Sequence, residues 1–172
     1  MDQNKGFVWQ ARVERTLKAL AKNRIPAVYV PNREEAVKTV ESMLRPGDVV
    51  TCGGSMTLAE TGVMDLLKSG AYEFLDRQAM DPEEVYRKTF GADVFLMSAN
   101  AITEDGELYN VDGNGNRVAA LIFGPKRVIV VAGINKLVRN LDEAIARVKG
   151  MDPEEAAKIT LENGKRFFRI EI

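Results

Sequence analysis

Histidine is absent from this 172-residue chain, and cysteine occurs once, as Cys52. The first absence excludes Ser-His-Asp and Cys-His catalysis, histidine-ligated zinc and the usual proton shuttle near neutral pH. The second excludes an internal disulfide and favours a reducing compartment. Acid–base chemistry in this chain must therefore use carboxylates, lysine, tyrosine or the single thiol.

Long apolar runs and an excess of one charge are also lacking. No apolar run approaches the roughly 18 residues of a membrane span, and residues 1–6 lack the apolar segment of a signal peptide. We therefore expect a cytoplasmic protein that does not cross a membrane. Lys and Arg number 24 against 25 Asp and Glu, a formal net charge of −1. That balance gives no general attraction to nucleic acid or anionic membrane, so an anion needs a local site.

Short β-type runs alternate with helical patterns along the chain. Apolar residues at helical spacing predict helices over residues 7–23, 33–43, 58–68, 82–90, 117–123, 141–149 and from 153 onward. The expected N-caps of four of these helices are Asn32, Asp81, Asn116 and Asn140. Strands are predicted over residues 25–30, 49–52, 72–75, 93–97, 128–132 and 166–172, with a hairpin that turns at Asp105-Gly106. This alternation and the length predict a single α/β domain over residues 1–172, a three-layer α/β/α sandwich with a mainly parallel sheet.

The first Gly-rich loop, Gly53-Gly54-Ser55-Met56-Thr57, lies between a predicted strand and a predicted helix. Gly54, Ser55 and Thr57 are candidates to bind an anion, because glycines expose backbone N–H groups and a helix N-terminus carries partial positive charge. Glu60, in the first turns of that helix, is the candidate general base. The alternative is a tight strand-to-helix turn with a serine cap and a first-turn acid that complements the dipole.

A second polar segment lies between the two most apolar strands, where an open α/β sheet places its ligands. Its candidate ligand-binding residues are Asn100, Asp112, Asn116, Arg117, Asn135 and Lys136. The run from Asp112 to Arg117 carries more polar side chains than a plain turn requires. Lys136 follows an apolar strand and is a candidate to meet a phosphate or carboxylate, with a solvated lysine as the alternative. Asp105 is expected to be a turn residue and Cys52 a small core residue.

The Gly-rich and polar loops contain a series of short motifs that follow one another in a fixed order. The motifs are Gly54-Ser55-x-Thr57-x-x-Glu60-x-Gly62, Asn100-Ala-Ile-Thr-x-Asp105-Gly106 and Asp112-Gly-x-Gly-Asn116-Arg117, followed by Gly124-Pro125 and Gly133-x-Asn135-Lys136. Together they resemble the LUD domain, the lactate utilisation protein C family, over about residues 48–150. The resemblance implies a fold like that of the ribose-5-phosphate isomerase, glucosamine-phosphate deaminase and CoA-transferase group.

The resemblance also implies a role in the oxidation of lactate to pyruvate, alongside partner subunits that carry iron–sulfur clusters. Longer family members carry a C-terminal cysteine cluster, which residues 1–172 lack, so we expect no cofactor and no metal bound by this chain itself. The expected partners are a small anionic metabolite and iron–sulfur subunits, without nucleic acid or membrane, and a homodimer stays open.

Two further functions stay open beside this one. The first is a stand-alone sugar-phosphate isomerase or CoA-transferase-like enzyme, because a Gly/Ser/Thr loop with carboxylates suits proton transfer next to a carbonyl. The second is a non-catalytic subunit whose loops dock a redox complex. The sequence does not decide whether the chain is an enzyme, since a fold alone does not specify a reaction.

Overall fold

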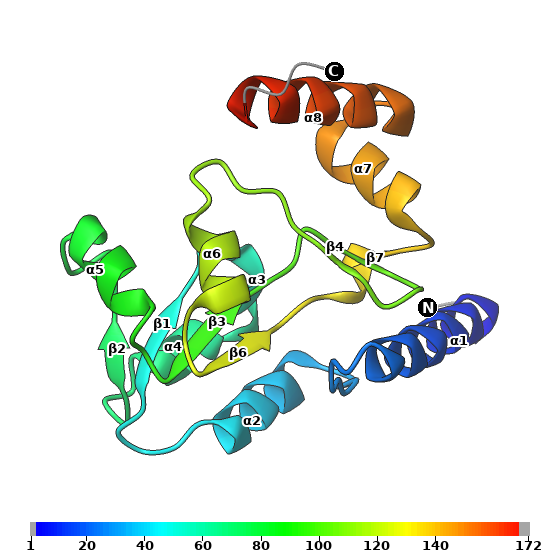
Figure 1. Ribbon diagram of the computed structural model, residues 1–172. Helices are drawn as coiled ribbons and strands as arrows, with labels where there is room; N and C mark the ends of the chain where they lie inside the picture. The colour runs from blue at the N-terminus through cyan, green and yellow to red at the C-terminus, as the bar shows by residue number, and fades with distance from the viewer. Residues whose placement is uncertain (1–2, 169–172) are drawn as a thin grey trace. The chain divides into compact units, whose positions relative to one another are not determined.

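The structure is a computed structural model that describes residues 3–168 (Figure 1). The helices are α1 (Gln3–Lys22), α2 (Arg33–Met43), α3 (Met56–Thr61), α4 (Val63–Leu67), α5 (Pro82–Thr89), α6 (Asn116–Phe123), α7 (Leu141–Lys149) and α8 (Pro153–Phe168), with a 3-10 helix η1 (Ile134–Lys136). The strands are β1 (Val49–Cys52), β2 (Glu73–Leu75), β3 (Val94–Met97), β4 (Ala101–Thr103), β5 (Leu108–Tyr109), β6 (Arg127–Val130) and β7 (Leu137–Val138).

These elements fall into two compact units, each made of segments that are separate in the sequence. Unit 1 takes its residues from Met1–Ala27, Asn100–Tyr109 and Lys136–Ile172. Unit 2 consists of Val28–Ala99 and Asn110–Asn135. The predicted single domain over residues 1–172 stays a prediction, and each unit is described by itself.

Unit 2 is built on a four-stranded parallel sheet with strand order β2-β1-β3-β6. Its strands are short, and β1 and β6 are rich in Val and other β-branched residues, which suit a buried parallel sheet. The central strand β3 is buried along its whole length, whereas the side chains of β6 are only partly buried. All four strands end on the same edge of the sheet, so the loops that follow them meet there.

Helices cover both faces of this sheet. Val50, Val94 and Leu96 point to the face that packs against α2, α3 and α4, where Leu58, Val63 and Leu67 complete the larger core cluster. Residues one position away point to the other face, so Phe95 and Met97 pack against Ala120 of α6. The predicted α/β class with a mainly parallel sheet is therefore confirmed, and unit 2 has the three layers of an α/β/α sandwich.

The caps read from the sequence begin the helices as predicted. Asn32, Asp81 and Asn140 each accept a hydrogen bond from the backbone N–H three residues later, at the N-termini of α2, α5 and α7. Pro82 occupies the first turn of α5, and Gly150 ends α7 in the left-handed conformation with φ of 64°. Local side-chain chemistry thus fixes where these helices start and stop.

Unit 1 contains α1, α7, α8 and a small sheet with strand order β5-β4-β7. The predicted hairpin is confirmed, because β4 and β5 pair in antiparallel fashion on either side of Asp105-Gly106. Gly106 has φ of 82°, and a Cβ atom there would lie 2.5 Å from the carbonyl carbon of Ala19. Glycine is therefore required both by the turn and by the close approach of α1. Asp105 is a turn residue, as expected.

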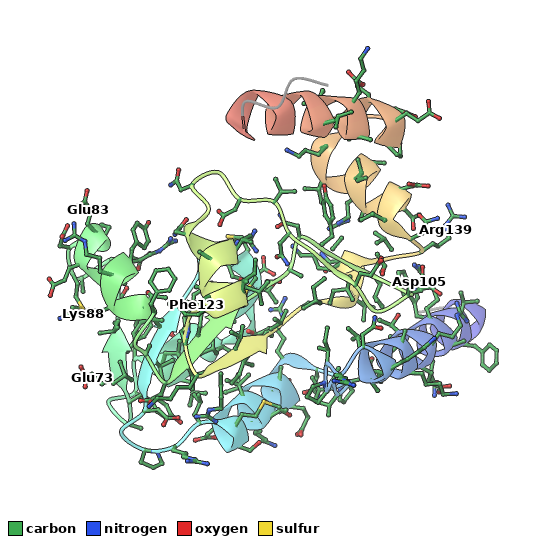
Figure 2. The ribbon with its side chains drawn as sticks, in the orientation of Figure 1. Glu73, Glu83, Lys88, Asp105, Phe123 and Arg139 are labelled. Carbon is green, nitrogen blue, oxygen red and sulfur yellow. The ribbon has the colours of Figure 1, made fainter. Side chains whose placement is uncertain are left out.

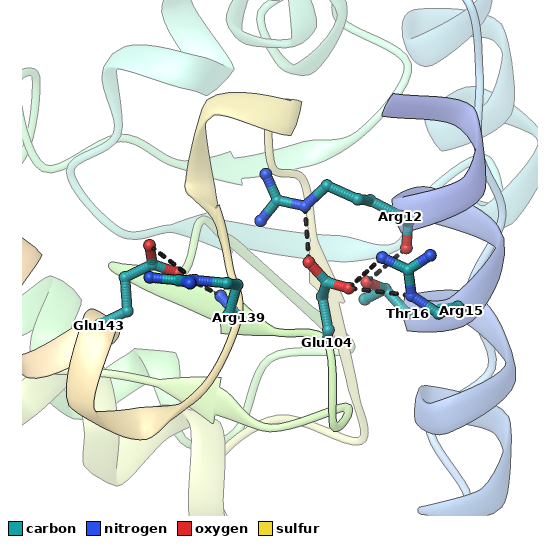
Figure 3. A network of polar contacts seen from close by, with 6 residues as sticks. All are labelled: Arg12, Arg15, Thr16, Glu104, Arg139 and Glu143. Atoms are coloured by element: carbon teal, nitrogen blue, oxygen red, sulfur yellow. Dashed lines mark hydrogen bonds and ion pairs between the residues drawn. The ribbon is translucent and has the colours of Figure 1, made fainter. Parts of the chain in front are cut away.

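A polar network holds the hairpin against α1 (Figure 3). The carboxylate of Glu104 accepts hydrogen bonds from Arg12 Nε and Arg15 Nη2, each at 2.6 Å, and Arg12 lies over the ring of Trp9 at 4.7 Å. Burial raises the pKa of Glu104, but hydrogen bonds from Arg15 and Arg12 outweigh it and hold the pKa below its usual value. Glu104 therefore serves the packing of unit 1.

Three element predictions were wrong. Residues 25–30 form no strand, and Val28 and Tyr29 are 64% and 54% exposed, because no neighbouring strand pairs with this segment. The helix predicted over residues 58–68 is broken at Gly62, whose φ of 86° ends α3 and starts α4. The strand predicted over residues 166–172 is wrong for residues 166–168, which belong to α8, and its remainder lies outside the described residues.

Two elements were not predicted, namely η1 and β7, which follow β6. The pairing of Leu137 with Ile102 of β4 makes β7 a strand, and a two-residue strand leaves no periodic pattern in the sequence. No helix within residues 3–168 combines the length and apolar character that crossing a bilayer requires.

Candidate functional site

A pocket of about 280 Å³ opens in unit 2 where the parallel strands end. Its walls come from the loop after β1, the residue Arg77 after β2, one side of α5, Phe95 of β3 and the loop that leads into α6. The lining residues are Cys52, Gly53, Gly54, Arg77, Val85, Tyr86, Thr89, Phe95, Asp112, Gly113, Asn114, Asn116, Arg117 and Ala120. The carboxyl edge of an open α/β sheet is where such folds bind ligands, and the pocket lies at that edge.

Gly53 and Gly54 form the floor of the pocket beside two arginines. A Cβ atom on Gly54 would lie 2.5 Å from Nη2 of Arg77, and one on Gly53 would lie 3.4 Å from Cδ of Arg117. The absence of side chains at these positions therefore lets both arginines approach the backbone. The two cations have different roles, because their guanidinium groups are bonded differently.

Arg117 is held by the protein itself. Its Nη1 donates to the carbonyl oxygen of Ser98 at 3.2 Å and to Oδ1 of Asn110 at 2.7 Å, and its Nη2 donates to the carbonyl oxygen of Val111 at 2.8 Å. These bonds tie the end of β3 to the loop that lines the pocket. Arg117 thus brings positive charge to the pocket while its N–H groups position the loop.

Asp112 caps the N-terminus of α6, although it lies four residues before the helix begins. One carboxylate oxygen, Oδ2, accepts the backbone N–H groups of Arg117 at 2.8 Å and Val118 at 3.0 Å. The sequence predicted Asn116 as the cap, but the helix begins at Asn116 itself, and the preceding Gly115 has φ of 77°. The reason is that Asp112 folds back onto the helix N-terminus, where a carboxylate is more favourable than an amide.

Arg77 is available to a ligand. Its guanidinium group makes no hydrogen bond or ion pair with the residues that the structure describes, although it lies directly against Gly54 in the pocket. Tyr86, from α5, lines the same pocket, and its hydroxyl group likewise has no hydrogen-bond partner in the described part of the chain. A guanidinium group without a protein partner can form paired hydrogen bonds with a carboxylate or phosphate.

Part of the pocket lining is apolar, and the single thiol belongs to it. Val85, Phe95 and Ala120 supply hydrocarbon surface, and Cys52 lies at the end of β1 with its Sγ 3.8 Å from the sulfur of Met64. Burial raises the pKa of Cys52 to about 11, although the positive charge of Arg77 acts in the opposite direction. Cys52 is therefore protonated near neutral pH. It packs against the larger core cluster, but it is only partly buried and also borders the pocket, so the prediction of a core residue is confirmed only in part.

Four of the predicted site residues line the pocket: Gly54, Asp112, Asn116 and Arg117. Ser55 is the N-cap of α3, because its Oγ accepts the N–H of Leu58 at 3.3 Å, and neither Ser55 nor Thr57 lines the pocket. The predicted base Glu60 is exposed on α3 and is also outside the pocket lining.

The remaining predicted residues lie elsewhere. Asn135 is exposed at the end of unit 2, whereas Asn100 and Lys136 belong to unit 1. The backbone N–H of Asn100 donates to the carbonyl oxygen of Tyr109 at 3.1 Å and closes the hairpin, and Lys136 ends η1. Ligand binding by these residues stays a prediction.

Arg77 and Tyr86 were missed by the sequence analysis. Arg77 carried a signal, because it follows the predicted strand at residues 72–75 by two positions, and the carboxyl ends of all strands meet at one edge. Tyr86 carried none, because the side of α5 that faces the pocket is decided by packing. Within residues 3–168 no cluster of three or more Cys, Asp or Glu side chains is arranged to hold a metal ion.

A comparison with models of protein families matches residues 13–164 to the LUD domain. Comparisons with curated proteins and with solved structures give no match. The family match covers every motif quoted above and extends beyond them at both ends, into α1 and α8.

Proposed function

The chain belongs to the LUD domain family, which is associated with lactate utilisation, and on that premise we propose that the unit 2 pocket binds a small organic acid of the lactate type. The carboxylate of the acid would pair with Arg77. Gly53, Gly54 and Tyr86 line the same pocket, and their backbone N–H groups and phenol hydroxyl would complete the polar contacts.

The observation that carries this proposal is the guanidinium group of Arg77 at the pocket. It is the lining cation whose hydrogen-bonding groups are unused by the described residues, whereas Arg117 is bonded to Ser98, Asn110 and Val111. A pocket of about 280 Å³ is at the small end of the range for ligand sites, which suits a metabolite of a few carbon atoms. The apolar wall at Val85 and Phe95 would receive the methyl group of such an acid.

We further propose that the chain acts with a redox partner in the cytoplasm. Oxidation of lactate to pyruvate releases two electrons and two protons, one from the hydroxyl group and one from the carbon that bears it. An iron–sulfur cluster needs several thiolate ligands, and residues 1–172 contain only Cys52. The two electrons would therefore pass one at a time to oxidised iron–sulfur clusters on partner subunits, and the two protons would pass to water, while this chain holds the acid.

Arg77→Gln tests the binding site directly. The full chain should bind lactate or pyruvate in isothermal titration calorimetry, and a ligand at about 100 times its Kd should add roughly 2.7 kcal/mol to the free energy of unfolding. Arg77→Gln should weaken the affinity about 10- to 100-fold, because a charge-assisted hydrogen bond is lost from a group that the protein does not otherwise use. The thermal midpoint without ligand should stay within about 2 °C, since Arg77 is exposed.

Arg87→Gln is the matched control for this substitution. Arg87 is also an exposed arginine, on α5, but it pairs with Glu83 and does not line the pocket. Its loss should leave ligand affinity unchanged. Sugar phosphates and CoA esters are measured in parallel, because tighter binding of either class through Arg77 would replace the organic acid by the isomerase or transferase alternative. If Arg77→Gln and the unsubstituted chain bind every compound with equal affinity, Arg77 is not part of a ligand site and the proposal is wrong.

A further inference from the structure

The parallel sheet of unit 2 has one unprotected edge, along β6. This strand pairs with β3 and with no other strand in the described part of the chain. The backbone N–H groups of Arg127 and Val131 donate to the carbonyl oxygens of Asp93 and Met97, at 3.1 and 2.8 Å. Because successive residues of a strand direct their backbone groups to opposite sides, those of Val128 and Val130 point away from β3. They make no hydrogen bond within residues 3–168.

The two edges of the sheet differ in how they are protected. Edge strands of soluble proteins are usually short, charged or covered, because free backbone groups invite pairing with another chain. At the other edge, β2 has three residues, carries exposed Glu73 and contacts α5 (Figure 2). By contrast, β6 carries no charge beyond its first residue, Arg127. Its edge is therefore of the kind that is normally covered.

A hollow borders β6 on this side of the unit. It has a volume of about 500 Å³ and is lined by Met43 and Leu44 at the end of α2 and by Val128 and Ile129 of β6, together with Ser42, Arg45 and Arg127. Met43 is 40% exposed, so its apolar side chain is accessible at the hollow. A hollow of mixed character, whose apolar part is formed by Met43, Leu44, Val128 and Ile129, lies here beside free strand groups. Such an arrangement can bind an added strand, whose backbone pairs with the edge while its side chains enter the hollow.

The same unit carries a segment with matching properties. Val28, Tyr29 and Val30 are residue types that favour strands, and they form neither a strand nor a helix. Their backbone groups have no hydrogen bonds with described residues, and the side chains of Val28 and Tyr29 are 64% and 54% exposed. Exposed backbone and apolar side chains in one segment are stabilised when the segment joins a sheet.

We infer that two copies of this chain form a homodimer in which Val28–Val30 of each copy adds as a strand to β6 of the other. The partner is a second copy because each chain carries both an open strand edge, β6, and a segment that can pair with it, Val28–Val30, and uses neither. A twofold symmetric pair then satisfies each half in both copies. Pairing β6 with β6 of a second copy would instead leave Val28 and Tyr29 exposed, so exchange of the two segments accounts for more of the surface.

Sedimentation velocity on the full chain, from about 1 to 300 µM, tests this inference. The unsubstituted chain should form a dimer whose fraction rises with concentration. Tyr29→Pro should give a monomer, because proline removes an N–H that the monomer does not use. Val128→Pro should do the same, since the N–H of Val128 points to the open edge. Tyr29→Lys is a second variant for the same contact, and it keeps the backbone donor while opposing burial.

Phe123→Lys is the control for general apolar attraction. Phe123 is 88% exposed at the end of α6 (Figure 2), and it does not line the hollow beside β6. The dimer should survive this change. Amide hydrogen exchange supplies the second measurement: protection at residues 28–30 and 128–130 should rise together with protein concentration.

Three results would overturn the inference. The first is a chain that stays monomeric at 300 µM. The second is a dimer that persists in both Tyr29→Pro and Tyr29→Lys, or one that Phe123→Lys dissolves, because either outcome moves the interface elsewhere. The third is amide protection of residues 28–30 that does not depend on concentration, which would show that the segment joins β6 of its own chain.

Discussion

Two arginines at the unit 2 pocket carry the same charge but differ in how far the protein uses their hydrogen-bond donors. Arg117 was selected from the sequence because it follows a Gly- and Asn-rich run, and it does line the pocket. Its guanidinium group nevertheless donates hydrogen bonds to Ser98, Asn110 and Val111, so these donors hold the fold together and are not free for a ligand. Arg77 was not selected, yet its hydrogen-bonding groups are unused by described residues. The number of unused donors, rather than the residue type, distinguishes the two.

Ser55 illustrates the same distinction between a structural and a ligand role. Its Oγ accepts the N–H of Leu58 and caps α3. Ser55→Ala should therefore lower the free energy of unfolding by about 1 kcal/mol, measured by urea denaturation, while leaving the affinity for the organic acid unchanged. Ser42→Ala, which removes an exposed hydroxyl without a capping role, should change stability by less than about 0.5 kcal/mol. Loss of ligand binding in Ser55→Ala would restore the ligand role predicted from the sequence.

Cys52 provides a pH-dependent test of burial at the pocket. Because burial raises its pKa to about 11 from 9.0, the thiolate fraction at pH 8 should be about a hundredfold below that of an unburied thiol. Alkylation by iodoacetamide, followed by mass spectrometry, should be slower by about that factor than in the urea-unfolded chain. The rate should rise about tenfold per pH unit until the pH approaches about 11.

The chain contains no other cysteine, so the label reports this position alone. The same shift has a consequence for stability. Below pH 9 the thiol is protonated in both states, and between 9 and 11 the unfolded chain ionises first, so folding loses stability as the pH rises. A folded-state rate that levels off near pH 9 would contradict the burial of this thiol.

At the scale of the element, single glycines decide boundaries that periodicity does not show. The apolar pattern over residues 58–68 is continuous, but the left-handed backbone of Gly62 divides it into α3 and α4. The hairpin between β4 and β5 was predicted correctly because Asp-Gly is a strong turn signal. What the signal could not reveal is that Gly106 also touches the backbone of α1.

Gly106→Ala should therefore cost more than a left-handed glycine does elsewhere. The new methyl group would meet backbone atoms of Ala19 and Leu20 at 2.5 to 2.8 Å, and neither can move without shifting α1. We expect a loss of roughly 2–5 kcal/mol in the free energy of unfolding, from strain in φ and from overpacking. Gly70→Ala isolates the first cause, because Gly70 has φ of 90° with no atom within 4 Å, and should cost about 1 kcal/mol. Equal losses for the two variants would show that the contact with α1 contributes nothing.

At the scale of the whole molecule, the chain passes between its two units several times. Residues 100–109 and 136 onward belong to unit 1, whereas the intervening residues 110–135 belong to unit 2. Motifs that are neighbours in the sequence are consequently divided: Asn135 and Lys136 are adjacent residues assigned to different units. Residues that are neighbours in the sequence therefore need not share a site, whereas residues at the ends of neighbouring strands do come together. The formal net charge of −1 gives no general attraction to a ligand, so recognition depends on individual side chains at such a site.

The sequence by itself determined the α/β class, most strands of the parallel sheet, the capped starts of α2, α5 and α7, the hairpin turn at Gly106 and the family. These features follow from local chemistry, because caps, turn dipeptides and apolar periodicity act within a few residues. Tertiary structure alone decided that Arg77 and Tyr86 face one pocket with Asp112, and that Arg117 is bonded to the protein. It also decided that residues 28–30 lack a strand partner. These outcomes depend on hydrogen bonds and packing between segments far apart in the chain, which no local pattern records.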